Sequence, residues 1–177
     1  MIFKILTIED KADLKQQILD MMQASDNDFV PPLSARSSTV QKNLKNTITS
    51  TDGIYKYFLE MEKQEILGAF DEEKLVGFVS FKIDYTDDVI KVDNIPNIYV
   101  STLVLSQEMR GKGITKVMYD LLFNKLYSSC NIFTRTWSTN VAHTKILSRF
   151  GFEELHRKKD DRGAGIDTVY FSLLRKK

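Results

Sequence analysis

Two glycines alternate with two basic residues at Arg110, Gly111, Lys112 and Gly113, and this combination of residue types could bind a phosphate group. An apolar, β-branched stretch precedes them and a helical pattern follows. The first N–H groups of a helix have no partner inside the helix, and the aligned peptide dipoles add positive potential there. Glycines let a phosphate approach these amides and permit positive φ angles. The segment therefore predicts a phosphate or diphosphate site.

A purely structural interpretation stays open, because Gly111 and Gly113 could simply make a tight turn from strand to helix. Two nucleotide-binding motifs can be tested by their patterns. The Walker A pattern G-x-x-x-x-G-K-[ST] is absent. A Rossmann loop needs a third glycine where Lys116 stands, and no acidic residue ends the next predicted strand. Both motifs are excluded, which disfavours a plain nucleotide-binding protein.

The other reactive side chains show no metal-ligand spacing. The two histidines and the single cysteine lie far apart along the chain, so we expect no metal site. Cys130 stands between a predicted helix and a predicted strand, and we expect it to pack in the core rather than carry an acyl group. His143 stands on a short predicted helix, and we expect its ring to be exposed.

The composition bounds the class of protein. The 177 residues are 42% hydrophobic and 28% charged, which is typical of one globular domain. The net charge is only +1, so no basic excess indicates a nucleic-acid partner. No apolar run approaches the roughly 18 residues of a membrane span, and the start becomes charged too soon for a secretory signal. With one cysteine and no internal disulfide, these features predict a cytoplasmic protein without a membrane partner.

The segment around Gly111 and Gly113 is called the glycine segment below. The apolar pattern predicts the helices and strands that must position it. In the N-terminal part we expect a strand over 1–7, a helix over 9–22, a short helix capped by Ser38 or Thr39 and running to residue 48, and a helix over 52–64. Further strands are expected over 65–71, 74–84, 97–105, 131–138, 152–156 and 166–174, with helices starting at Ile114 and after Asn140. This order predicts a mixed α/β sheet with helices packed on it.

Two segments resemble the GNAT N-acetyltransferase superfamily. LVLSQEMRGKGITKVMYDLL resembles the acetyl-CoA-binding segment, whose signature is Arg or Gln, two residues, Gly, one residue, and Gly or Ala. Arg110, Gly113 and Thr115 occupy these positions, and Thr115 departs from the pattern. NVAHTKILSRFGF is similar to the family's second segment, with Asn140 at its head. The resemblance implies one N-acetyltransferase domain over 1–177 with the GNAT acyl-CoA fold, a mostly antiparallel sheet containing a splayed parallel strand pair.

The resemblance also implies which residues bind the coenzyme, acetyl-CoA. Backbone groups of the central strand would hold the pantetheine arm, the amides of the glycine segment would hold the diphosphate, and an asparagine would face the pantetheine or the adenosine. The implied set is Leu103, Val104, Leu105, Arg110, Gly111, Lys112, Gly113, Ile114, Thr115 and Asn140. Lys116 or Lys145 would either meet the ribose phosphate or lie in solvent.

The implied reaction is direct transfer of the acetyl group to a primary amine of a small molecule, amino acid or peptide. Deprotonating an amine with a pKa of about 10.4 at pH 7 costs about 4–5 kcal/mol, so a base is needed. Tyr99, Asp93 and Asn94 stand where family bases or water-holding residues occur. Many members use a tyrosine seven residues after the asparagine as general acid, and here that position is Leu147. The general acid is thus unassigned, and a CoA-binding module with weak or no catalysis is the alternative.

The acceptor side is less defined by sequence. Arg36 follows a double proline and could bind a carboxylate on the acceptor, or it could simply belong to a rigid turn. Trp137 could form a wall of the acceptor channel or pack in the core. The expected partner is a small-molecule or peptide amine, and a homodimer stays open because many members of the superfamily pair.

Overall fold

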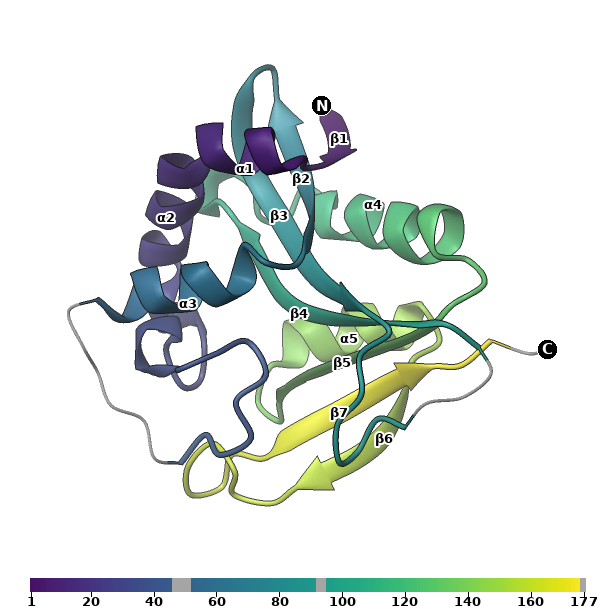
Figure 1. Cartoon of the computed structure of the whole chain (residues 1–177). Coiled ribbons are helices and arrows are strands. Elements are labelled where there is room, and N and C mark those ends of the chain that lie inside the picture. Colours follow the sequence, from purple (N-terminus) through teal and green to yellow (C-terminus); the bar gives the residue numbers. More distant parts are fainter. Residues whose placement is uncertain (46–51, 92–94, 176–177) are drawn as a thin grey trace.

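Seven strands form one sheet in the order β1-β2-β3-β4-β5-β7-β6 (Figure 1). The structure is a computed structural model and describes residues 1–45, 52–91 and 95–175. The strands are β1 (Ile2–Ile5), β2 (Glu65–Asp71), β3 (Lys74–Ile83), β4 (Asn97–Leu105), β5 (Asn131–Trp137), β6 (Glu153–Lys158) and β7 (Thr168–Leu173). Neighbouring strands are antiparallel except for β4 and β5, which run parallel. The predicted mixed sheet is confirmed.

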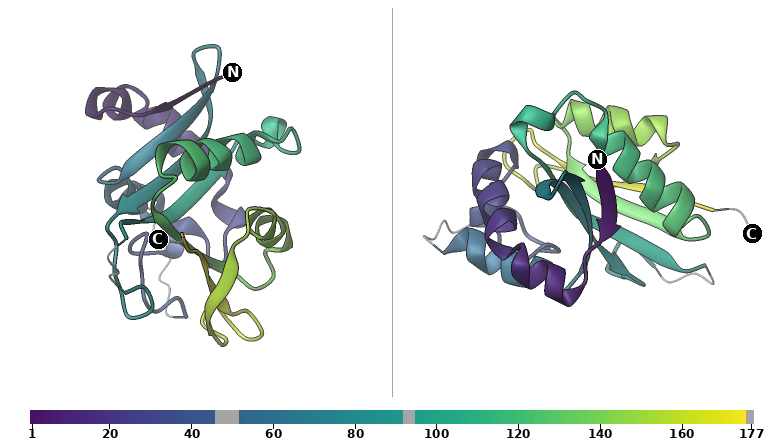
Figure 2. Two further views of the ribbon diagram at one scale, coloured as in Figure 1. Left: turned by 90° about the vertical axis from the view of Figure 1, so that its right-hand side faces the viewer. Right: turned by 90° about the horizontal axis from the view of Figure 1, so that it is seen from above.

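Helices cover both faces of this sheet (Figure 2). They are α1 (Ile8–Asp13), α2 (Lys15–Ala24), α3 (Gly53–Met61), α4 (Ile114–Asp120) and α5 (Val141–Arg149). The π-helical η4 (Leu121–Leu126) continues α4, and the 3₁₀ turns η1 (Asp26–Asp28), η2 (Leu33–Ala35) and η3 (Gln107–Met109) lie in connections. The helices α1, α2 and α3 lie on one face, and α4 and α5 lie on the other. Across the described ranges, every helix is too short or too polar to cross a membrane.

The N-terminal predictions need two corrections. The helix expected over 9–22 is divided at Leu14, whose φ of −90° and ψ of 0° leave the helical region. The helix expected from Ser38 or Thr39 is wrong as far as residue 45, and residues 46–48 lie outside the described chain. Here side chains hydrogen-bond to nearby amides, as Ser38 Oγ does with the N–H of Val40 at 3.4 Å. Such local bonds compete with helix formation.

The core has one large apolar cluster on each side of the sheet. The cluster beneath α4 and α5 includes Met118, Phe123 and Leu147, and the cluster beneath α2 and α3 includes Met22 and Phe58. Burying a side chain of this size contributes about 1.5–3 kcal/mol relative to leaving it exposed. The two clusters hold the centre of the sheet between rigid helical layers.

The parallel strands β4 and β5 separate partway along their length. Their pairing runs from Asn97 opposite Asn131 to Val100 opposite Thr134, and residues 101–105 have no partner on β5 in the described chain. Against β3, Ser101 is an extra residue between Val100 and Thr102, which is a β-bulge. A bulge bends its strand and increases the local twist, so the bulge accounts for the separation directly after Val100.

Candidate active site

A cavity of about 340 Å³ opens where β4 and β5 separate. Its walls are residues 100–105 of β4 and 134–137 of β5, with side chains of α4 and α5 at one end and of the η1, η2 and β6–β7 connections at the other. Successive side chains of a strand point to opposite faces, so Thr134 and Thr136 face α5 while Arg135 and Trp137 face the opposite side. The cavity therefore passes through the sheet from one helical layer to the other.

The point of separation is fixed by side-chain hydroxyl groups. Thr134 Oγ1 donates to the carbonyl oxygen of Val100 at 3.0 Å, at the last paired position of β4 and β5. The bulged Ser101 donates from its hydroxyl to Oε1 of the buried Gln64 at 2.6 Å. Hydrogen bonds of this kind contribute about 1 kcal/mol each, and the buried one is costly to leave unmade. These hydrogen bonds thus fix the position at which β4 and β5 separate.

The glycine segment requires glycine for its backbone conformation. Gly111 has a φ of 76° and Gly113 a φ of 79°, and a Cβ added at either position would meet no atom of the described residues within 4 Å. An L-residue in the left-handed region is strained by about 1–2 kcal/mol. Conformation rather than lack of space within the protein therefore explains why two glycines stand one residue apart.

The backbone amides of this segment lack acceptors. Gly113 is the N-cap residue of α4 and provides no side-chain cap. Among the described residues, no backbone or side-chain acceptor pairs with the N–H groups of residues 111–116. These amides precede or begin a helix, where the peptide dipoles favour a negative charge.

Most of the predicted coenzyme-binding residues meet at this cavity. Its lining includes Leu103, Val104, Leu105, Arg110, Gly111, Thr115 and Asn140. Lys112, Gly113 and Ile114 are not part of the lining. The side chain of Ile114 is buried in the core beneath α4, so only its backbone could serve a ligand. Lys116 and Lys145 are exposed.

The side chain of Arg110 is used within the protein. Its Nη2 lies 2.6 Å from Oδ2 of Asp28 in η1, and its Nε donates to the carbonyl oxygen of Leu105 at 3.3 Å. Both charged side chains are almost half exposed, at 43% and 44%, so this pair contributes at most about 1 kcal/mol. Arg110 ties the glycine segment to the N-terminal part of the chain.

Asn140 positions the start of α5. Its Oδ1 accepts from the N–H of His143 at 3.3 Å, and its Nδ2 donates to Oγ1 of Thr136 on β5 at 3.0 Å. These bonds satisfy the helix start and hold it against the strand. Leu147, two turns later, is fully buried in the core, so the position of the expected tyrosine offers neither a proton nor access to the cavity.

A tyrosine and a histidine form a hydrogen-bonded pair on the α4/α5 side. Tyr119 Oη lies 2.8 Å from His143 Nε2, and both side chains line the cavity. The expectation that His143 is exposed is wrong, because its ring packs between α5 and Tyr119. Burial lowers the pKa of His143 to about 4 and raises the pKa of Tyr119. Both groups are therefore uncharged at pH 7.

The predicted acceptor residues and bases fall into three groups. Arg36 and Trp137 line the cavity. Tyr99 is not among the lining residues but lies buried against Tyr85 with ring centroids 4.6 Å apart, and burial raises its pKa to about 12. Tyr99 is thus a protonated phenol at pH 7 and is not placed to act as a base. Asp93 and Asn94 lie outside the described residues.

Among the polar lining residues, several that are central to the site were not assigned to it from the sequence. Tyr119, Arg135, His143 and Arg162 all contribute to the cavity wall. Arg135 had a recognisable signal, since it is a charged residue inside an otherwise uncharged strand. Arg162 had none, because it belongs to a loop in which charged residues are common.

Comparisons with known proteins agree with this geometry. The sequence model described as Acetyltransferase (GNAT) family matches residues 33–152, and no curated protein matches the chain. The ribosomal-protein-alanine N-acetyltransferase from Brucella melitensis is 15% identical, with a TM-score of 0.66 over 99% of this chain and 100% of its own. The structure of yncA from Salmonella typhimurium with its cofactor acetyl-CoA is 13% identical, with a TM-score of 0.65 over 100% of this chain and 95% of its own.

A third similar structure also contains the coenzyme. An aminoglycoside 6'-N-acetyltransferase complexed with coenzyme A is 14% identical, with a TM-score of 0.66 and coverage of 100% of both chains. At these identities, the three likenesses show a shared fold.

Proposed function

The chain belongs to the GNAT acetyltransferase family, and on this premise we propose that it transfers an acetyl group from acetyl-CoA directly to a primary amine. The acceptor is a small molecule, an amino acid or a peptide. The coenzyme enters the cavity from the α4/α5 side and the amine from the opposite side. This assignment follows from a cavity that passes through the sheet between β4 and β5.

The observation that carries the proposal is the row of amides over residues 111–116. They have no acceptor among the described residues, and Gly111 lies in the cavity wall. A diphosphate offers several anionic oxygens, and the start of a helix preceded by glycines supplies several N–H donors together. Charge-assisted bonds of this kind are roughly twice as strong as neutral ones. The backbone, rather than lysine side chains, holds the diphosphate.

The pantetheine arm occupies the open edge of β4. In a strand, the N–H and C=O groups point alternately to the two neighbouring strands. Over residues 101–105, the groups that would pair with β5 have no partner there in the described chain. A pantetheine arm carries amide groups that can take the place of the absent strand. Leu103, Val104 and Leu105 supply this edge, and Asn140 at the start of α5 lines the same cavity.

Removal of a proton from the amine requires a base. The one carboxylate in the described cavity lining is Asp28, which is already paired with Arg110 at 2.6 Å. Because Tyr99 is buried and protonated, Asp93 is the residue that we keep as the proposed base or water-holding group. An amine with a pKa of about 10.4 makes this role necessary at pH 7.

Departure of the CoA thiolate is assisted by the pair formed by Tyr119 and His143. His143 lies one helical turn before Leu147 on α5, where members of the family carry the tyrosine. The Tyr119 hydroxyl group reaches this turn from α4 through its 2.8 Å contact with His143. Since a thiol has a pKa of about 8.5, its thiolate leaves readily and needs only a hydrogen-bond donor. We assign that donor to Tyr119.

The alternative is a CoA-binding module with weak or no catalysis. It is favoured by one observation, the fully buried Leu147 in the position of the family's general acid. In the module, Tyr119 and His143 only pack the wall between α4 and α5.

Thiol release and coenzyme binding separate the two functions. The enzyme releases CoA thiol from acetyl-CoA in the presence of a panel of primary amines, and it binds CoA in a calorimetric titration. Binding without thiol release above the amine-free background would leave the module as the answer. Absence of CoA binding would overturn both functions.

A further inference from the structure

Three arginines from distant parts of the chain meet at the cavity on the side opposite α4 and α5. Arg36 follows η2, Arg135 lies on β5, and Arg162 lies in the connection between β6 and β7; all three line the cavity. We name them the arginine cluster. Arginine side chains rarely gather away from acidic partners, because each buried charge needs compensation.

The arginine cluster is held by neutral acceptors. Arg36 donates from Nε and Nη2 to the carbonyl oxygen of Pro31 at 3.0 and 2.8 Å. Arg135 donates from Nη2 to the carbonyl oxygen of Gln41 at 2.7 Å and from Nη1 to Tyr170 Oη at 3.2 Å. None of these partners carries a charge, so the bonds orient the guanidinium groups without neutralising them.

Arg162 is held in the same way. Its Nη1 donates to the carbonyl oxygen of Val30, and its Nε donates to Oγ1 of Thr168 at 3.0 Å. The carboxylate of Asp161 is nearby but accepts from Thr168 Oγ1 at 2.6 Å, and so it reaches Arg162 only through that hydroxyl group. Among the described residues, Arg36, Arg135 and Arg162 form no ion pair.

Each guanidinium group also keeps a nitrogen for a ligand. Nη1 of Arg36, Nε of Arg135 and Nη2 of Arg162 have no acceptor in the described part of the chain. Guanidinium groups match the geometry of carboxylate and phosphate oxygens better than any other side chain.

The charge of the cavity differs from that of the whole chain. The described lining contains four arginines and one aspartate, and that aspartate, Asp28, is paired with Arg110. Three positive charges remain on one side of the cavity, although the chain as a whole has a net charge of only +1. Burial, followed by repulsion from Arg36 and Arg135, lowers the pKa of Arg162 to about 9. Burial also lowers the pKa of Arg36. Because guanidinium groups stay protonated in proteins at pH 7, the cluster is charged, and it has no counter-ion among the described residues.

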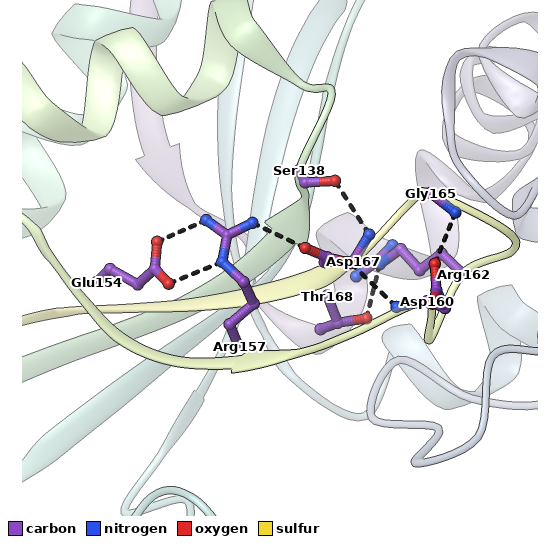
Figure 3. A network of polar contacts seen from close by, with 8 residues as sticks. All are labelled: Ser138, Glu154, Arg157, Asp160, Arg162, Gly165, Asp167 and Thr168. Atoms are coloured by element: carbon purple, nitrogen blue, oxygen red, sulfur yellow. Dashed lines mark hydrogen bonds and ion pairs between the residues drawn. The ribbon is translucent and has the colours of Figure 1, made fainter.

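The connection that carries Arg162 is held in place by its own hydrogen bonds and ion pairs (Figure 3). Asp167 accepts from Arg157 Nη1 and from the N–H of Asp160, each at 2.9 Å, and its own N–H donates to Ser138 Oγ at 3.0 Å. The N–H of Gly165 donates to Asp160 Oδ1 at 2.6 Å. A group that is already ordered loses less conformational freedom on binding.

We propose that the acceptor amine carries an anionic group, a carboxylate or a phosphate, and that Arg36, Arg135 and Arg162 bind this group while the amine points toward β4. The inference rests on the proposed acetyl transfer, since it names the substrate class of the same site. A polyamine without an anionic group meets three repelling charges here and is a poor acceptor.

Binding of simple anions tests the cluster without knowledge of the substrate. The protein is first saturated with CoA, which occupies the diphosphate site, and its melting temperature is then measured with succinate, inorganic phosphate or neutral succinamide at constant ionic strength. At concentrations well above Kd, succinate or phosphate raises the melting temperature by about 2–4 °C, and succinamide does not. A rise with succinate alone identifies a carboxylate, and one with phosphate alone identifies a phosphate. Equal melting temperatures in all three solutions overturn the proposal.

Substitutions in the arginine cluster test whether the anion binds there. Arg135→Gln abolishes the rise, whereas the charge-preserving Arg135→Lys keeps part of it, each variant being compared with its own anion-free sample. Arg149→Gln, at an exposed position on α5, keeps the full rise. A rise that survives unchanged in Arg135→Gln places the anion elsewhere and overturns the assignment.

Turnover provides a second readout. In matched pairs of amines, such as a dipeptide and its C-terminal amide or an amino alcohol and its phosphate ester, the anionic member has a kcat/KM about ten- to hundred-fold higher. Arg135→Gln brings the ratio toward one while the affinity for CoA is unchanged. If CoA binds and amines are acetylated without such a preference, the acetyl transfer stands and the anionic acceptor is wrong. If CoA neither binds nor raises the melting temperature, the proposed function itself fails.

Discussion

The two ends of the cavity present different kinds of groups to a ligand, main-chain amides at one end and side chains at the other. At the α4 end, the amides of consecutive residues 111–116 have no acceptor among the described residues, and two glycines with positive φ shape this segment. At the opposite end, the prepared groups are side chains, and they come from three segments that are far apart in sequence, at Arg36, Arg135 and Arg162. A site made of consecutive main-chain groups can be predicted from a short stretch of sequence. A site made of side chains from distant segments forms only when the chain has folded. The following experiments test this difference between the two ends.

The largest effect is expected when main-chain conformation is disturbed at the α4 end. Gly113→Val forces an L-residue into a φ of 79° and displaces the amides, so we expect CoA affinity to fall about 100-fold, or roughly 2.7 kcal/mol. The measurement is a calorimetric titration with CoA.

Gly165→Val is the matched control for this variant. Gly165 has a φ of 74° and equally open surroundings, but it lies in the β6–β7 connection. Both variants should lose a similar amount of stability, about 1–2 kcal/mol, and only Gly113→Val should lose CoA affinity. An equal loss of affinity in the two would mean that general destabilisation, and not the amides, is responsible.

The two ends should also differ in their response to pH. Burial lowers the pKa of His143 from 6.5 to about 4, so between these values the unfolded chain binds more protons than the folded one. Stability therefore rises with pH across this window and is lost as the pH falls from about 6.5 toward 4, by roughly 1–3 kcal/mol. The arginine cluster keeps its charge throughout.

Chemical denaturation at several pH values measures this dependence. His143→Gln should remove that part of the pH slope, whereas His156→Gln, at an exposed position of β6, should leave it in place. A slope that is unchanged in His143→Gln would show that other groups cause the loss of stability at low pH.

A smaller effect, on kcat, is expected for a side chain at the α4 end that takes part in the proposed chemistry. Tyr119→Phe removes the hydroxyl group 2.8 Å from His143 and is expected to lower kcat about ten-fold. The affinity for CoA should stay within a factor of about two, since we propose that the hydroxyl group acts only on the departing thiolate. Tyr55→Phe, on an exposed ring of α3, is the control. An unchanged kcat in Tyr119→Phe would mean that the thiolate leaves unassisted.

The smallest effect should come from a charged side chain in the glycine segment. Arg110→Gln breaks the half-exposed pair with Asp28, so stability should fall by less than about 1 kcal/mol. Because we assign diphosphate binding to amides, CoA affinity should change less than about three-fold. A loss as large as that of Gly113→Val would show that a side chain, and not the backbone, holds the diphosphate.

The same contrast explains what could be predicted from the sequence. Gly111, Gly113 and Asn140 act within a few residues of their own position, on a left-handed turn and at a helix start, so their local geometry could be predicted from the sequence. The strands of the sheet were likewise predictable from alternation and β-branched residues. These features depend on local geometry.

The features that could not be predicted from the sequence depend on contacts between distant segments. Arg162 meets Val30 across 132 positions of the chain, and no spacing rule connects them. His143 was misjudged because a ring of Tyr119 on α4 covers it. Tyr99 seemed available as a base, but the aromatic rings of Tyr85 and its neighbours bury it. Tertiary packing decided each of these outcomes.

The bulge at Ser101 also changes which way β4 presents its side chains. Val100 and Leu103 are three positions apart and would face opposite layers in a regular strand, yet both pack toward α4 and α5. The inserted residue resets the alternation at the place where the strand leaves β5. As a result, a passage runs through the middle of the sheet. The apolar side of β4 is nevertheless covered by α4 and α5 both before and after the bulge.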